Sequence, residues 1–242
     1  MNKSVLITGG AKRIGKSIAE VLWTKGWNII LHYRSSSKDA MSLVNNFNSK
    51  RADSAFAIKA DLDDPKEVEK LVADTLKCYG SLDALINNAS TFFPTPISEI
   101  NDKNWAALIN SNLKAPIFLI AGLADAIDKN KGNIINITDI NVERGLANHS
   151  IYIAAKAGLD AITKVFARDL SPNIRVNAIA PGAILEPPGV SWTKEQKQKI
   201  IKKVPLKKMG DETDISNAVL FLIESDYVTG QIINVDGGKS II

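Results

Sequence analysis

The sequence predicts a single doubly wound α/β domain, in which helices flank a parallel seven-stranded sheet. Two observations predict this fold. Short apolar runs alternate with segments of helical spacing along the whole chain, and these runs are continuously apolar. Such runs are typical of strands buried on both faces, and sheets buried in this way are usually parallel. A length of 242 residues with 45% hydrophobic composition suits one large core, so we assign 1–242 to one domain.

The apolar runs give the expected strands in chain order. These are Val5–Thr8, Asn28–His32, Ala55–Ala60, Ala84–Asn87, Asn133–Thr138, Arg175–Ile179 and Gln231–Val235. The expected helices between them are Ile14–Lys25, Lys38–Asn48, Pro65–Tyr79, Asn104–Ile127, His149–Leu170 and Glu212–Ile223. In doubly wound sheets, ligands bind outside the carboxyl ends of the strands, where the strand order reverses. Residues that directly follow strands are therefore the first candidates for a site.

The segment 183–208 interrupts this alternation, and we expect it to be an insert that closes over a substrate. It begins with prolines and glycine and then holds seven lysines between Lys194 and Lys208. No aromatic interleaving or DNA-reading motif accompanies these lysines, so nucleic-acid binding is not expected despite a net charge of +4. The lysines form either a solvated helix face or a surface that attracts anionic ligands.

The first strand leads into a glycine-rich turn, Thr8-Gly9-Gly10-Ala11-Lys12-Arg13-Ile14-Gly15, and then into a helix. Glycines let the backbone approach a pyrophosphate, and the helix N-terminus supplies unpaired N–H donors. Glycines alone could simply make the turn. Their place between the first strand and the first helix favours a dinucleotide site.

The end of the second strand favours NADPH over NADH. Chains that select NAD usually place an acidic residue there to bind the ribose 2′-hydroxyl. This chain instead has His32-Tyr33-Arg34-Ser35-Ser36. The guanidinium of Arg34 and the hydroxyl of Ser35 suit a 2′-phosphate, and Arg13 could reach the same charge. The alternative is a surface arginine in a polar loop.

Tyr152 and Lys156 are four residues apart in a helical pattern, so they share one face of the helix. A neighbouring ammonium is expected to lower the pKa of the phenol from about 10, which makes a usable proton donor. Thirteen residues upstream, Asp139 ends an apolar run. Asp139 is either part of this proton site or a cap or turn residue after the fifth strand.

These motifs together resemble the short-chain dehydrogenase/reductase family over essentially the whole chain, and that family has a Rossmann-type fold. Further matches are Asp61, Asn87-Asn88-Ala89, Asn112 and Pro181-Gly182. The resemblance and the turn together give an expected cofactor set: Gly9, Arg13, Ile14, Arg34, Ser35, Asp61, Leu62, Asn87, Ala89, Tyr152, Lys156, Pro181 and Gly182. The family resemblance also implies that Asn112 holds a water linking Lys156 to solvent. The expected catalytic set is therefore Asn112, Asp139, Tyr152 and Lys156.

Two departures from the common pattern resemble the pteridine reductase branch. Arg13 stands where a small residue is usual, and Asp139 stands where a serine is usual. Ser90-Thr-Phe-Phe-Pro-Thr-Pro96 is similar to the same branch, and 138–145 is similar to bacterial dihydromonapterin reductases, which also act on dihydrofolate. This resemblance implies that Phe92 stacks on a pterin while Phe93 is core. The expected substrate set is Arg13, Ser90, Phe92, Asp139 and Tyr152.

The expected activity is NADPH-dependent reduction of a dihydropterin (dihydrobiopterin, dihydromonapterin or dihydrofolate type) to the tetrahydro form. Hydride would pass to a ring C=N, and the proton would come from Tyr152 or water, with Asp139 and Lys156 setting the supply. The alternative is a short-chain carbonyl or 3-oxoacyl-ACP reductase, whose acidic carrier protein would suit the lysine-rich insert. A dinucleotide-sensing regulator is disfavoured, because both Tyr152 and Lys156 are present.

The expected partner is a small pterin or folate substrate, and no residue is assigned to a metal. The resemblance implies a homotetramer, with a dimer as the alternative. We expect a cytoplasmic protein for two reasons. The single cysteine excludes an internal disulfide, and the strand-like run that follows Met1 is not the pattern of a signal peptide. No membrane association is expected, because no apolar run reaches about 18 residues.

Overall fold

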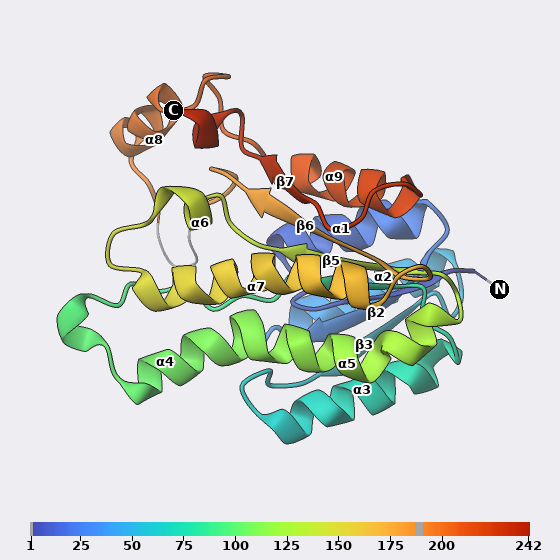
Figure 1. The fold of residues 1–242 in the computed structure, drawn as a ribbon. Helices are drawn as coiled ribbons and strands as arrows, with labels where there is room; N and C mark the ends of the chain where they lie inside the picture. The colour runs from blue at the N-terminus through green and yellow to red at the C-terminus, as the bar shows by residue number, and fades with distance from the viewer. Residues whose placement is uncertain (1, 187–190) are drawn as a thin grey trace.

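The computed structural model describes residues 2–186 and 191–242, and it has the predicted doubly wound architecture (Figure 1). Seven parallel strands form one sheet in the order β3-β2-β1-β4-β5-β6-β7. The strands are β1 (Ser4–Ile7), β2 (Asn28–Tyr33), β3 (Ala55–Lys59), β4 (Ala84–Asn87), β5 (Asn133–Ile137), β6 (Arg175–Pro181) and β7 (Ile232–Val235). The order reverses between β1 and β4, so a ligand site is expected at their carboxyl ends.

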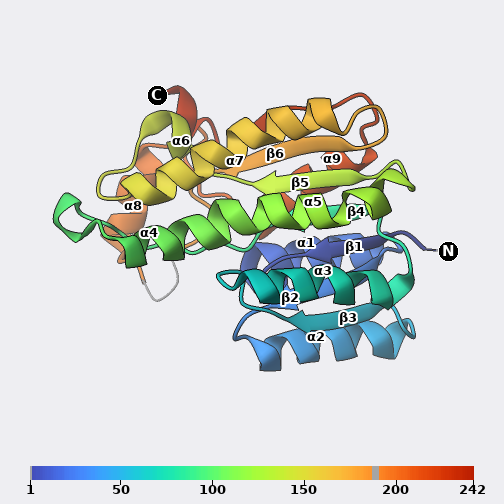
Figure 2. The same ribbon diagram turned by 60° about the horizontal axis from the view of Figure 1, so that its bottom comes forward.

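Helices cover both faces of the sheet, as Figures 1 and 2 show. One face carries α1 (Arg13–Thr24), α2 (Ser37–Lys50) and α9 (Glu212–Glu224), and the other carries α3 (Pro65–Tyr79), α5 (Ala115–Asp128) and α7 (Ser150–Asp169). Within β1, Val5 and Ile7 enter the first core while Leu6 enters the second. Every residue of β1, β4 and β5 is buried in this way between two helical layers, which explains the continuous apolar runs of the central strands.

The helix predicted over 104–127 is interrupted. It consists of α4 (Asp102–Ile109), one wide π-helical turn (Asn110–Lys114) and α5. By length and composition alone, the whole stretch Asp102–Asp128 is long and apolar enough to cross a membrane, with a mean hydropathy of 1.4 in its most apolar window. It is not an uninterrupted apolar run, because Asn110, Asn112 and Lys114 lie within it. However, 44% of that window is buried, and the stretch packs against α3 and α7. This packing is that of a core helix.

The insert predicted over 183–208 contains a helix, α8 (Lys194–Lys202), and residues 187–190 of it lie outside the described part of the chain. A capping box starts α8: the Thr193 hydroxyl accepts from the Gln196 N–H at 3.3 Å, and the Gln196 side chain accepts from the Thr193 N–H at 2.8 Å. Three short elements were not predicted: η1 (Ile97–Glu99), α6 (Asn141–Arg144) and η3 (Lys239–Ile241). Of these, α6 and η3 gather with α8 at one corner of the molecule.

Candidate active site

The turn between β1 and α1 is too tight for larger residues. Gly9 has a φ of +62°, and a Cβ added to Gly15 would lie 2.3 Å from the Gly9 carbonyl oxygen. Among the residues that the structure describes, the N-cap residue Lys12 makes no side-chain capping bond, so the first N–H groups of α1 are available for an anion there. The geometry therefore fits the predicted pyrophosphate cradle.

His32, which the sequence analysis did not single out, braces this turn. Its Nδ1 accepts from the Gly9 N–H at 3.1 Å, and its Nε2 lies 3.1 Å from the Ala60 carbonyl oxygen. Burial lowers the pKa of His32 to about 4, so the ring is neutral and donates from Nε2. One buried imidazole thus ties the turn after β1 to the end of β3.

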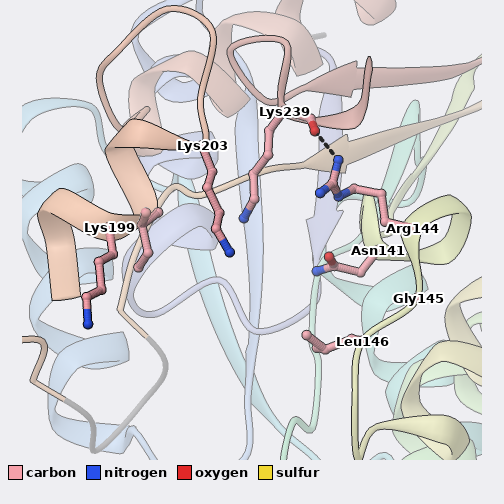
Figure 3. Close-up of a pocket in the computed structure, with 8 residues that line it drawn as sticks. Asn141, Arg144, Gly145, Leu146, Lys199, Lys203 and Lys239 are labelled. Atoms are coloured by element: carbon pink, nitrogen blue, oxygen red, sulfur yellow. Dashed lines mark hydrogen bonds between the residues drawn. The ribbon is translucent and has the colours of Figure 1, made fainter. Parts of the chain in front are cut away.

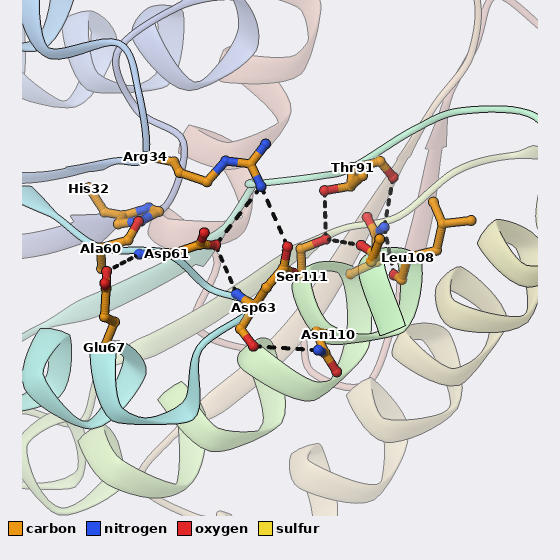
Figure 4. A network of polar contacts seen from close by, with 12 residues as sticks. His32, Arg34, Ala60, Asp61, Asp63, Glu67, Thr91, Leu108, Asn110 and Ser111 are labelled. Carbon is orange, nitrogen blue, oxygen red and sulfur yellow. Dashed lines mark hydrogen bonds and ion pairs between the residues drawn. The ribbon is translucent and has the colours of Figure 1, made fainter. Parts of the chain in front are cut away.

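The predicted phosphate-binding arginine lies in an acidic network at the ends of β2 and β3 (Figure 4). A guanidinium nitrogen of Arg34 is 3.5 Å from an oxygen of Asp63 and 3.9 Å from one of Asp61. Asp61 also accepts from the Asp63 N–H at 3.1 Å. Burial, followed by the charge of Asp61, raises the pKa of Asp63. A 2′-phosphate would therefore compete with two carboxylates for Arg34, whose side chain is 56% exposed.

The end of β4 carries a buried acceptor without a partner in the described part of the chain. The amide of Asn87 donates to the Asn136 oxygen at 2.8 Å, while the Asn87 Oδ1 atom has no partner. The Thr8 hydroxyl oxygen accepts from the N–H groups of Asn88 and Ala89 at 2.9 and 3.0 Å. These bonds hold the ends of β1 and β4 together, and the orphaned oxygen fits a ligand donor.

Asp139 and Tyr152 form a direct hydrogen bond. The Tyr152 hydroxyl donates to one Asp139 oxygen at 2.9 Å, and the Asn141 N–H donates to the other at 2.7 Å. Asp139 is thus both a turn residue before α6 and part of the proton site. The two readings that the sequence left open are compatible.

Lys156, one turn along α7 from Tyr152, is buried, and its ammonium donates to the Ile137 carbonyl oxygen at 2.8 Å. Burial lowers the pKa of Lys156 to about 8, and the charges of Asp139 and Asp160 oppose that shift. The expectation of a lowered phenol pKa was wrong. Burial first, and then the charge and hydrogen bond of Asp139, raise the pKa of Tyr152 well above its usual value. The phenol therefore keeps its proton.

Asn112 lies in the π-helical turn and uses its whole amide within the protein. Its oxygen accepts from the Ser90 hydroxyl at 2.7 Å, and its nitrogen donates to the carbonyl oxygens of Thr91 and Leu108 at 2.8 and 2.9 Å. Asn112 thereby fixes the segment after β4 beside Tyr152. The water implied at Asn112 stays a prediction.

The ring of Phe92 stands over the same site. It stacks on His149 with ring centroids 4.7 Å apart, and it lies nearly perpendicular to the Tyr152 ring with centroids 4.8 Å apart. Phe92 and Phe93 are both partly buried against one small apolar cluster, so core packing is not confined to Phe93. His149 was missed, because only the tertiary contact reveals it. One face of Phe92 is occupied by that imidazole.

The other residues predicted to contact the cofactor or substrate lie in the segments around this site. Arg13, with a φ of +54°, donates to the Glu186 carbonyl oxygen at 2.5 Å, at the beginning of the insert. The side chains of Ile14 and Leu62 pack into the two cores, which leaves their backbones for a ligand. Pro181 ends β6, and a Cβ on the following Gly182 would lie 2.5 Å from Asp236. Ser35 is exposed just beyond β2.

Comparison with known proteins gives the family. The family model described as enoyl-(acyl carrier protein) reductase matches residues 9–240. The chain belongs to the short-chain dehydrogenase/reductase family. Proteins named 3-oxoacyl-[acyl-carrier-protein] reductase FabG are 36% identical to it: the one from Staphylococcus epidermidis covers 98% of this chain and 99% of its own length, and the one from Staphylococcus aureus 98% of each. Pteridine reductase 1 of Leishmania tarentolae is 34% identical over 98% of this chain and 96% of its own length.

As a member of this family, the chain is an oxidoreductase with one Rossmann-like domain. In this short-chain reductase, a protonated phenol and a buried ammonium lie at the carboxyl edge that also carries the glycine-rich turn. The turn, the free helix N-terminus and the orphaned Asn87 oxygen fit a dinucleotide. The site can thus deliver a proton next to a bound redox cofactor.

Proposed function

We propose that this oxidoreductase reduces a dihydropterin to its tetrahydro form with NADPH. The observation that carries the proposal is the 2.9 Å hydrogen bond from Tyr152 to Asp139. Reduction of a carbonyl builds negative charge on oxygen, and a neighbouring carboxylate would repel that charge. Reduction of a ring C=N instead requires a proton on nitrogen. The Tyr152 phenol, which burial and Asp139 keep protonated, would give its proton to that nitrogen, and the ammonium of Lys156 would stabilise the phenolate until a proton from water replaces the one transferred.

Residues of the chain would hold charge, position neighbouring groups and stack on the substrate. Lys156 holds positive charge beneath the phenol, and Asn112 positions Ser90 beside it. His149 covers one face of the Phe92 ring, and a pterin would stack on the opposite face. Such stacking would contribute roughly 1 kcal/mol of binding free energy beyond the burial of apolar area. When bound, the nicotinamide supplies the hydride.

NADPH is proposed over NADH because the acidic residue of an NAD site is replaced by Arg34 and Ser35. Arg34→Ala should raise the KM for NADPH roughly tenfold to a hundredfold, since hydrogen bonds to charged groups contribute about 1.5–3 kcal/mol. The KM for NADH should change little. Steady-state kinetics with both cofactors measure this, and equal effects on both would contradict the preference.

Reduction of a 3-oxoacyl thioester is the second candidate, and the comparisons support it more directly than pterin reduction. Several of the similar relatives are named for that reaction, at 36% identity, whereas the pteridine reductase is at 34%. The lysine-rich α8 also suits an acidic carrier protein. We favour the pterin because relatives of such similar identity do not separate the two substrates, whereas the site contains Asp139.

A direct assay separates the candidates. NADPH is mixed with dihydrobiopterin, dihydrofolate or an acetoacetyl thioester, and absorbance at the nicotinamide band is followed. We expect rapid oxidation with a dihydropterin and a slow reaction with the thioester. Oxidation with the thioester alone would establish the second candidate instead.

Asp139→Ser tests the residue that carries the proposal. The kcat/KM for dihydropterin should fall by about a hundredfold, the scale of one acid–base group, while thioester reduction should rise. Asp139→Asn, which keeps the shape but not the charge, should lose pterin activity without gaining the thioester. Full dihydropterin activity in Asp139→Ser would show that the assigned role is wrong.

A further inference from the structure

A cavity of about 320 Å³ opens between α6, α8 and η3 (Figure 3). We call it the cationic pocket, because Arg144, Lys199, Lys203 and Lys239 line it together with Asn141. In Figure 3, Lys203 and Lys239 extend into the same space, and Arg144 and Asn141 stand on its other side. Four positive charges from three separate segments therefore converge on one hollow.

In the described part of the chain, none of these four side chains lies at ion-pair distance from an acidic side chain. Arg144 instead donates to the main-chain oxygens of Lys239 and Ile242, which hold its side chain in the wall of the pocket. Burial and the charges of Arg144 and Lys203 lower the pKa of Lys239, although Asp139 and Asp236 oppose this. An anion in the pocket would relieve this repulsion.

The pocket adjoins the active site. Asn141 lines it, and the N–H of the same residue donates to Asp139 at 2.7 Å. The charge of Asp139 also acts on Lys239, so the two sites share one electrostatic environment. A molecule that reacts beside Tyr152 can therefore extend its remaining part into the pocket.

We propose that the cationic pocket binds the anionic end of the substrate, a carboxylate or phosphate carried on the pterin side chain. This assignment rests on the proposed pterin reduction. The cavity is of the size that small ligand groups fill, about 300 Å³ or more. Its concave shape fits a tethered small group, whereas a carrier protein would use a broader surface.

Substrate selectivity tests the assignment. Dihydrobiopterin has an uncharged side chain, dihydrofolate ends in carboxylates, and dihydroneopterin monophosphate ends in a phosphate. In the double variant Lys199→Gln/Lys203→Gln, the preference for an anionic over the neutral substrate, measured as a ratio of KM values, should fall about five- to tenfold. The anionic substrate with the larger loss identifies the natural anion.

A matched control separates local binding from general attraction. Lys194→Gln/Lys202→Gln removes the same charge from the same helix, outside the pocket lining. This control should keep the wild-type KM ratio at low and moderate salt. Equal losses in both double variants, or equal changes for neutral and anionic substrates, would overturn the pocket assignment.

A binding measurement keeps the pocket separate from the reaction. The enzyme with NADP⁺ is titrated by calorimetry with triglutamate and with inorganic phosphate. We expect at least one anion to bind the wild type and the Lys194/Lys202 control, but to bind Lys199→Gln/Lys203→Gln at least fivefold more weakly. If neither anion binds the wild type, the pocket assignment fails, even where dihydropterin is reduced. Failure to reduce any dihydropterin, with anion binding intact, would defeat the proposed function and the pterin part of the assignment, while the pocket itself would remain an anion site.

Discussion

The phenol of Tyr152 takes its properties from residues on other elements rather than from its helical neighbour. Lys156 lies one turn away on α7, but its ammonium is 5.8 Å from the centre of the Tyr152 ring and donates to β5 instead. Asp139, from the loop after β5, holds the hydroxyl hydrogen. Burial and this carboxylate keep the phenol protonated, while Lys156 keeps a pKa of about 8. The ammonium is thus the group at this site that titrates near neutral pH.

The lowered pKa of Lys156 predicts how catalysis depends on pH. Because the pKa of Lys156 is lowered to about 8, its positive charge is present below that pH and is lost above it. If the ammonium is needed in the reaction, kcat/KM should be level on the acid side of 8 and fall with rising pH beyond it. A pH profile at constant ionic strength measures this. A profile that stays level to pH 10 would contradict it.

The charge of Asp160 is expected to set the pH at which kcat/KM falls, the alkaline limb of the profile. Asp160 lies one turn beyond Lys156 on α7, has a buried oxygen without a partner in the described residues, and titrates with a pKa raised by burial to about 6. Above pH 6 its negative charge favours the ammonium. Asp160→Asn should therefore move the alkaline limb to lower pH. Asp169→Asn, at the exposed end of the same helix, should leave it in place, and an unmoved limb in Asp160→Asn would exclude this role.

At the scale of elements, the junction of β1 and α1 is built on close backbone approach. Gly15→Ala places a methyl group 2.3 Å from the Gly9 carbonyl oxygen, so the turn must open. Overpacking of this kind costs about 1–3 kcal/mol, and the cradle for the pyrophosphate loses its shape. The Kd for NADPH should rise about tenfold or more, as measured by fluorescence titration.

Gly80→Ala is the control for that change. Gly80 caps α3 with a φ of +68°, and no described residue lies within 4 Å of a Cβ added there, so alanine at this position strains only the backbone, far from the turn. It should lower the free energy of unfolding by about 1 kcal/mol without changing the Kd for NADPH. If both variants weaken NADPH equally, general destabilisation explains the effect.

At the scale of the whole molecule, α5 and α7 lie side by side (Figures 1 and 2), and each has an exposed apolar side chain. Phe118 is 50% exposed and Val165 is 51% exposed. We propose that copies of the chain associate over this face to form a homotetramer, since exposed apolar patches mark interfaces. Sedimentation should give about four times the chain mass of 26.2 kDa.

Phe118→Glu/Val165→Glu should reduce that mass, because each new charge would be buried at the interface without a partner. Met41→Glu, on the opposite face of the sheet and 45% exposed, should not. A monomeric wild type would end the proposal. Unchanged sedimentation of the double variant would move the interface to another face. The cytoplasmic location stays a prediction.

Local patterns in the sequence determined the parallel sheet and the order of strands and helices along the chain. They also placed the glycine-rich turn, Tyr152 and Asp139 near the same carboxyl edge of the sheet. They could do so because strand and helix periodicity is local, and because parallel strands carry their following residues to the same edge. Only the tertiary structure decided the interactions between distant segments: Arg34 with Asp63, Phe92 with His149, and Arg144 with the backbone of Lys239. It also decided the direction in which the pKa of Tyr152 moves. Spacing brings a charge near a phenol, but burial and hydrogen bonding set its ionisation, and both exist only in the folded chain.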